Sequence, residues 1–68
     1  MNYFEWSQEY YDTAEKIENT ILSLKAKRKN AVFSEKKELD LRISKYREIY
    51  NECIQTADLL FERYKGAA

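Results

Sequence analysis

The chain is short and electrically neutral, with no histidine and a single cysteine. A core built from 68 residues rarely supplies more than about 3–5 kcal/mol of net stability, so we expect self-association to add to it. Without histidine, and with Cys53 alone, the chain lacks the ligands of a structural zinc site and the second thiol of an intramolecular disulfide. We therefore expect no metal and no cofactor.

The composition favours a folded helical protein. Hydrophobic residues make up 44% of the chain, which is too much apolar material for a disordered tail. There is no proline, and the one glycine is Gly66, so nothing interrupts long helices and strands have no support. No uncharged apolar stretch is long enough to span a bilayer and there is no signal-like run, so we expect a cytoplasmic protein without a membrane partner.

The first helix is expected at residues 3–29. Asn2 is its predicted cap, accepting a hydrogen bond from the amide of Glu5 while the Glu5 side chain reaches back. Apolar residues then recur at steps of three and four, which predicts one apolar face made of Tyr3, Trp6, Tyr10, Ala14, Ile17, Ile21, Leu24 and Ala31.

The turn is expected at residues 30–34. Asn30 tolerates a left-handed conformation and is the predicted stop of the first helix, and Ser34 is the predicted cap of the second. Lys37 stands where a capping box would place an acidic residue. The alternative of one continuous helix therefore stays open.

The second helix is expected at residues 35–65, with Gly66 as its terminating residue. It carries a heptad seam of Leu39, Ile43, Tyr46, Tyr50, Cys53, Ala57, Leu60 and Tyr64. Folding the chain back at residue 32 would bring Tyr3 near Phe61, and Trp6 near Ala57. The predicted fold class is thus all-α, a single two-helix antiparallel hairpin over residues 1–68.

A second row of apolar residues predicts a dimer. Ile49, Ile54 and Phe61 widen the apolar face of the second helix beyond what one partner helix covers. We expect two hairpins to form an antiparallel four-helix bundle whose dimer interface is Ile49, Tyr50, Ile54, Ala57 and Phe61.

Charge is distributed unevenly along the neutral chain. Residues 1–18 carry five acidic side chains and one basic one (−4), and residues 25–37 carry six basic and one acidic (+5). A hairpin turns this into an acidic open end and a basic tip, and an antiparallel dimer brings the tip of one copy beside the open end of the other. The same cations are the candidate phosphate-binding residues of an alternative function, nucleic-acid binding: Lys25, Lys27, Arg28, Lys29, Lys36 and Lys37.

No enzymatic activity is predicted, because the chain has no histidine, no glycine-rich phosphate loop and no third helix to enclose a pocket. Cys53 lies on the seam and is interpreted as a small core residue rather than a redox thiol. The leading hypothesis is a small interaction or structural protein that acts as a homodimer. The alternatives are a nucleic-acid-binding accessory and an inhibitor or regulator of an unidentified protein partner.

Two segments carry a resemblance to other proteins. The run NYFEWSQEYY over residues 2–11 and the run YNECIQTA over residues 50–57 resemble short, uncharacterised all-helical proteins of Firmicutes and their prophages or mobile elements. The resemblance implies an all-helical fold and a mobile-element setting. It brings no known activity and no known catalytic or binding residues.

Overall fold

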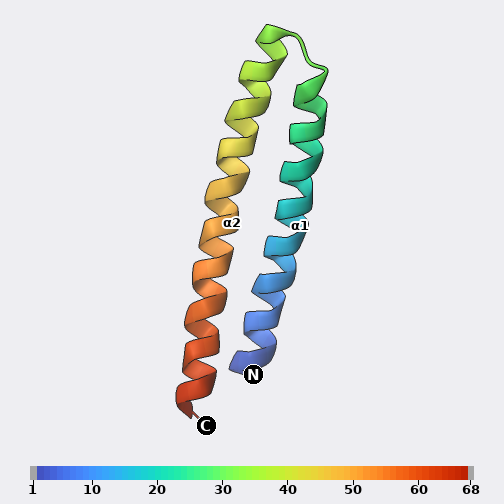
Figure 1. The fold of residues 1–68 in the computed structure, drawn as a ribbon. Helices are drawn as coiled ribbons and strands as arrows, with labels where there is room; N and C mark the ends of the chain where they lie inside the picture. The colour runs from blue at the N-terminus through green and yellow to red at the C-terminus, as the bar shows by residue number, and fades with distance from the viewer. Residues whose placement is uncertain (1, 68) are drawn as a thin grey trace.

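The structure is a computed structural model that describes residues 2–67; positions 1 and 68 of the expected domain lie outside the described residues. Helix α1 spans Tyr3–Lys29 and helix α2 spans Phe33–Ala67, and the two pack side by side in opposite directions (Figure 1). Their Cα atoms fill a rod of 53 × 14 × 14 Å. The all-helical hairpin expected from the sequence is confirmed. No helix in the described part of the chain is long and apolar enough to cross a membrane.

Helix α1 begins with the predicted cap, in a different pairing. Asn2 has an extended backbone (φ −101°, ψ 125°), and its Oδ1 accepts from the amide of Phe4 at 2.8 Å rather than from that of Glu5. The carbonyl of Asn2 accepts the first helical hydrogen bond, from the amide of Trp6 at 3.0 Å. The cap thus satisfies one of the amides that a helix start leaves without a partner.

The connection between the helices is shorter than expected. Lys36 already donates its amide to the carbonyl of Val32 at 2.9 Å, so Ser34 lies inside the first turn of α2 and does not cap it. Asn30 is not left-handed: its φ is −107° and ψ is 5°. Its amide bonds to the carbonyl of Lys27 at 3.3 Å, which ends α1 in a tightened turn that needs no positive φ. The break at residues 30–32 also excludes one continuous helix.

The end of α2 departs from the prediction as well. The helix runs through Gly66 to Ala67, two residues beyond the expected end at Lys65. Gly66 has no positive φ, so it continues the helix instead of closing it with a left-handed residue.

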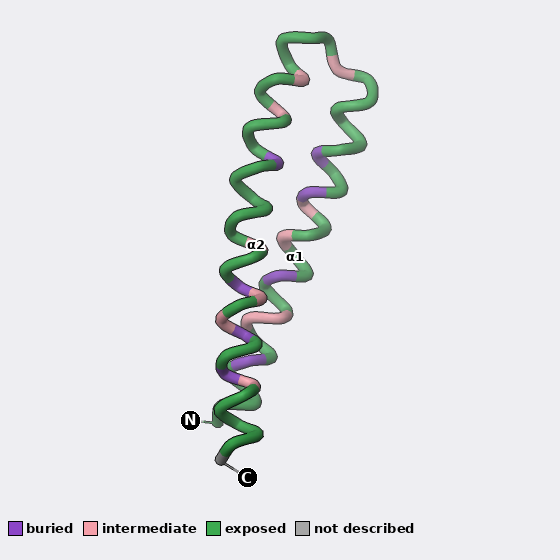
Figure 2. The backbone as a smooth tube through the Cα atoms, turned by 60° about the vertical axis from the view of Figure 1, so that its left-hand side comes forward, coloured by how far each residue is buried: buried purple, intermediate pink, exposed green. Residues whose placement is uncertain are grey.

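The core is a single seam between the two helices. Near the tip, Ile21, Leu24 and Ile43 are buried together, with Ile17 and Leu39 packed against them. In the open half the buried side chains are mostly small, and only Leu60 is large: Ser7, Ala14, Cys53, Ala57 and Leu60. The buried positions lie where α1 and α2 face each other (Figure 2).

The two helices pair in a register roughly one turn away from the expected one. The ring of Phe4 lies 5.3 Å from that of Tyr64, whereas folding at residue 32 would have set Tyr3 beside Phe61. The seam of α1 accordingly contains Ser7, which is 0% exposed, in place of Trp6, which is 38% exposed. A small residue at this position lets the helix axes approach closely, which an indole between them would prevent.

Candidate interaction surfaces

Two packed helices leave two broad faces, one on each side of the seam. The side of α2 that carries Phe33, Asp40, Arg47, Ile54 and Phe61, spaced seven residues apart, is called here the Phe61 face. Its groove, of ≈ 260 Å³, is lined by Glu18, Ile21, Leu22, Lys25, Arg47 and Tyr50. The opposite side is called the Ile49 face, and its groove, of ≈ 370 Å³, is lined by Thr20, Leu24, Arg42, Lys45, Tyr46 and Ile49.

The structure separates the five residues expected at the dimer interface. Tyr50, Ile54 and Phe61 are half-buried and lie toward the Phe61 face. Ile49 is 44% exposed but lines the opposite groove, because the five residues from Ile49 to Ile54 turn a helix by about 140°. Ala57 is 0% exposed between the helices, so it offers no surface to a second copy. Tyr50, Ile54 and Phe61 are the members of this set that share one accessible face.

Aromatic side chains gather at the open end of the hairpin. Tyr64 contacts Phe4 from the opposite helix, and its ring centroid lies 6.0 Å from that of Phe61. The ammonium of Lys65 lies over the Phe61 ring at 5.6 Å, which is a cation–π distance. Because Phe4 and Tyr64 remain 40% and 41% exposed, this aromatic cluster of Phe4, Phe61 and Tyr64 presents apolar surface to solvent.

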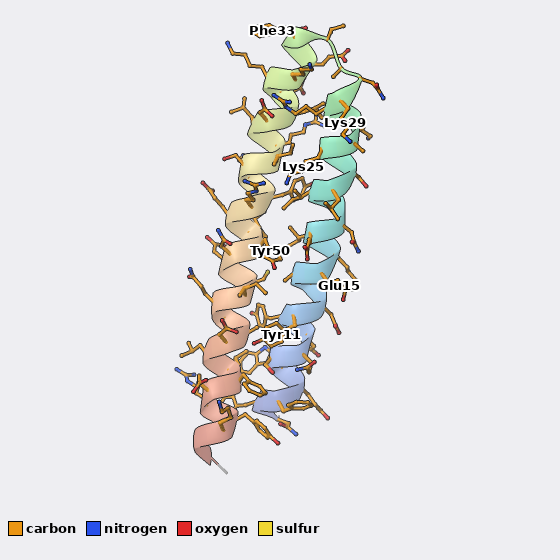
Figure 3. The ribbon with its side chains drawn as sticks, viewed as in Figure 1. Tyr11, Glu15, Lys25, Lys29, Phe33 and Tyr50 are labelled. Atoms are coloured by element: carbon orange, nitrogen blue, oxygen red, sulfur yellow. The ribbon has the colours of Figure 1, made fainter. Side chains whose placement is uncertain are left out.

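One polar contact joins the helices beside the aromatic cluster. The hydroxyl of Tyr11 donates to a carboxylate oxygen of Asp58 at 2.5 Å. This hydrogen bond, together with partial burial and the negative charges of Asp58 and Glu62, raises the pKa of Tyr11 above its ordinary value. Tyr11 points from α1 toward α2 (Figure 3).

The structure brings the candidate phosphate-binding residues together at the tip. Lys25, Lys27, Arg28 and Lys29 form the end of α1, and Lys36 and Lys37 lie in the first turns of α2. Arg28 already has an anionic partner, because its Nε donates to a carboxylate oxygen of Asp40 at 2.7 Å. This ion pair links the two helices. Lys27, Lys29, Lys36 and Lys37 lie near the apex of the hairpin, and Lys25 lies farther down α1, in the groove of the Phe61 face.

An apolar apex at the tip is the surface feature that sequence reasoning missed. Phe33 is 82% exposed and Val32 62% exposed. Figure 3 shows Phe33 at the tip, where α2 begins, and Lys29 near the end of α1. A signal for it existed, since Phe33 stands seven residues before Asp40 and off the heptad seam. A side chain at this position is expected to point away from the other helix of the hairpin.

The metal-ligating side chains of the described residues do not gather in one place. Residues 2–67 contain no group of three or more histidine, cysteine, aspartate or glutamate side chains placed to hold a metal ion. Cys53 is a buried, free thiol on the seam. The hairpin's grooves are open, and their charged lining residues, such as Lys25 and Arg42, lie on exposed helix faces.

Comparison with known proteins gave no match to a family model, to a curated protein or to a solved structure. The resemblance to short all-helical proteins of Firmicutes stays a prediction. Function is therefore inferred from the surfaces of the hairpin.

Proposed function

We propose that this protein is a non-enzymatic interaction or structural protein that acts as a homodimer, with two hairpins packed into an antiparallel four-helix bundle. A buried free thiol and the lack of a membrane-spanning helix among the described residues support a place in the reducing cytoplasm. The observation that carries the proposal is the segregation of charge along the rod.

The rod divides into two halves of equal and opposite charge. Residues 19–49, which form the tip half, hold nine Lys and Arg against four Asp and Glu, a net +5. The open half, made of the remaining residues of both helices, holds three basic side chains against eight acidic ones, a net −5. Such a molecule attracts a second copy most strongly when the two lie antiparallel, with each basic tip beside an acidic open end.

Exposed apolar side chains supply the second part of the argument. Leu22 is 56% exposed and lines the groove of the Phe61 face, beside Tyr50. Burying such side chains in a bundle stabilises it by about 25 cal/mol per Å² of apolar surface. A short hairpin with a narrow core needs this additional stability.

The test is the solution mass, measured by sedimentation at low micromolar concentration and at two salt levels. We expect a dimer whose dissociation constant rises with salt, because opposite charges at the two ends contribute to association. Leu22→Glu should weaken the dimer or give a monomer, since it places a carboxylate among the exposed apolar side chains of the groove on the Phe61 face. Leu41→Glu is the matched control, because Leu41 is 71% exposed among α2 residues on the outer side, and it should leave the dimer unchanged. A wild type that is monomeric at both salt levels would contradict the proposal, whereas equal effects of the two variants would place the second copy on a different face.

The basic tip favours a second candidate function, nucleic-acid binding. The five cations not paired with Asp40 could contact phosphates on one strand or across a groove. This function predicts retardation of DNA or RNA at low salt that disappears when Lys36 and Lys37 are changed to Gln. Absence of retardation at low salt would remove it.

A further inference from the structure

We propose that the second copy covers the Phe61 face, and that Phe33 at the apex of each hairpin packs on Phe61 and Tyr64 of the other. This inference rests on the proposed dimer and names its face and its register. The most exposed aromatic ring, that of Phe33, lies at the apex, and a cluster of half-exposed rings lies at the open end.

Phe33 lies on the same side of the seam as Phe61. The two residues are separated by four heptads of α2, a spacing that keeps them in phase with the partner helix. Arg47, two heptads after Phe33, identifies the side, because it lines the groove of the Phe61 face. Nothing in its own hairpin covers Phe33, which is 82% exposed.

Antiparallel packing of two such faces brings these rings together. Consider a two-fold axis that lies in the contact plane and is perpendicular to the long axis of the rod. It sets α2 of one copy against α2 of the other, and the two helices run in opposite directions. The apex of each 53 Å rod then stands level with the open end of the other. Phe33 thus meets the end of α2 that holds Phe61 and Tyr64, whose rings already contact each other.

Charge favours this register over a parallel one. Lys36 and Lys37 follow Phe33 by one turn, while Asp58 and Glu62 flank the aromatic cluster of the open end. An antiparallel pair sets these opposite charges around each apolar contact, and the two-fold axis repeats the arrangement at the other end. A parallel pair would place ten unpaired tip cations together.

The face is large enough for a stable dimer. Its outline of 53 by 14 Å corresponds to roughly 740 Å², close to the about 800 Å² that each partner buries in an interface of standard size. A contact along the whole face, from apex to open end, is therefore needed to reach that size. A shorter overlap that left Phe33 uncovered would bury less of the face.

The test is disulfide crosslinking in a Cys53→Ala background, so that only introduced thiols react. The double variant Phe33→Cys and Lys65→Cys places one thiol at the apex and one beside the aromatic cluster. These positions lie at opposite ends of α2, so a disulfide between them joins two copies. We expect a covalent dimer under mild oxidation, and we expect Leu41→Cys with Lys65→Cys, the matched control on the outer side of α2, to stay uncrosslinked.

A second measurement uses the intact dimer. Phe33→Asp should raise the dissociation constant roughly tenfold or more, as expected for a buried aromatic anchor, while Leu41→Asp should leave it within about twofold. A dimer that neither crosslinks at position 33 nor responds to Phe33→Asp overturns this inference and leaves the proposed function standing. Equal crosslinking of test and control variants also overturns it. A wild type that is monomeric overturns both, and binding of nucleic acid that depends on Phe33 would then assign the apex to that partner.

Discussion

The hydroxyl of Tyr11 joins the two helices at the level of Asp58, and the bond has a consequence for pH. Ionisation of Tyr11 would break the hydrogen bond and leave a phenolate beside the carboxylates of Asp58 and Glu62, which is why its pKa is raised. The folded protein thus holds this proton to higher pH than the unfolded chain does, where the pKa is about 10. The stabilisation is fully present below that pH and is lost as pH rises through the folded pKa.

We therefore expect Tyr11 to titrate later than an unperturbed tyrosine. An ultraviolet absorbance titration of the wild type and of Tyr11→Phe gives the curve of Tyr11 by difference, and its midpoint should lie above about 10. Tyr3→Phe is the control, since its difference curve reports another tyrosine of the same hairpin. A Tyr11 midpoint at or below the ordinary value would show that the bond to Asp58 does not persist in solution.

At single positions, burial was the least predictable property. Apolarity assigned Trp6 to the seam, whereas the structure buries Ser7 and leaves Trp6 at the edge. A serine hydroxyl can be buried here because it donates to the carbonyl of Phe4 at 2.7 Å within its own helix. The pattern of polar and apolar residues does not reveal that a buried hydroxyl can form a hydrogen bond within its own helix. Cys53, by contrast, lies buried as the heptad spacing indicated.

The helices themselves were largely predictable, because their period and their caps are local features. The range Tyr3–Lys29 of α1 is the expected one, and the seam of α2 contains the expected buried residues Ile43, Cys53 and Leu60. The connection and the register were not predictable. The register depends on how closely the helix axes approach, and small residues on both helices determine that distance together. The connection depends on a turn that closes without the left-handed residue expected at Asn30.

The start of α1 provides a test at the level of the helix. Asn2→Ala removes the acceptor that satisfies the amide of Phe4, so the free energy of unfolding should fall by about 1 kcal/mol. Urea denaturation followed by circular dichroism measures the change. Asn2→Asp is the control, because it keeps the acceptor and adds a negative charge at the positive helix end, and it should stay within a few tenths of a kcal/mol of the wild type or exceed it. An alanine variant as stable as the wild type would contradict the role of the cap.

At the scale of the whole molecule, the sequence pattern predicted the hairpin, whereas the dimer is inferred from complementary surfaces. Every buried residue of the described chain lies on one seam, and its open half is filled mostly by small side chains. This leaves a narrow core for two long helices, while exposed rings and opposite charges remain at the two ends. An antiparallel pair would bury these exposed rings and bring the opposite charges of the two ends together.

If dimerisation supplies part of the stability, the melting temperature must depend on protein concentration. A tenfold dilution costs a dimer about 1.4 kcal/mol, and with an unfolding entropy of about 2.1 cal/mol/K per residue over two chains this lowers the midpoint by roughly 5 °C. Thermal unfolding of the wild type across a hundredfold range of concentration measures the shift. Leu22→Glu should melt at a lower temperature that does not change on dilution, whereas Leu41→Glu should follow the wild type. A wild-type midpoint independent of concentration would mean that the seam between α1 and α2 is sufficient by itself, and that Phe33 and Leu22 remain exposed in the folded protein.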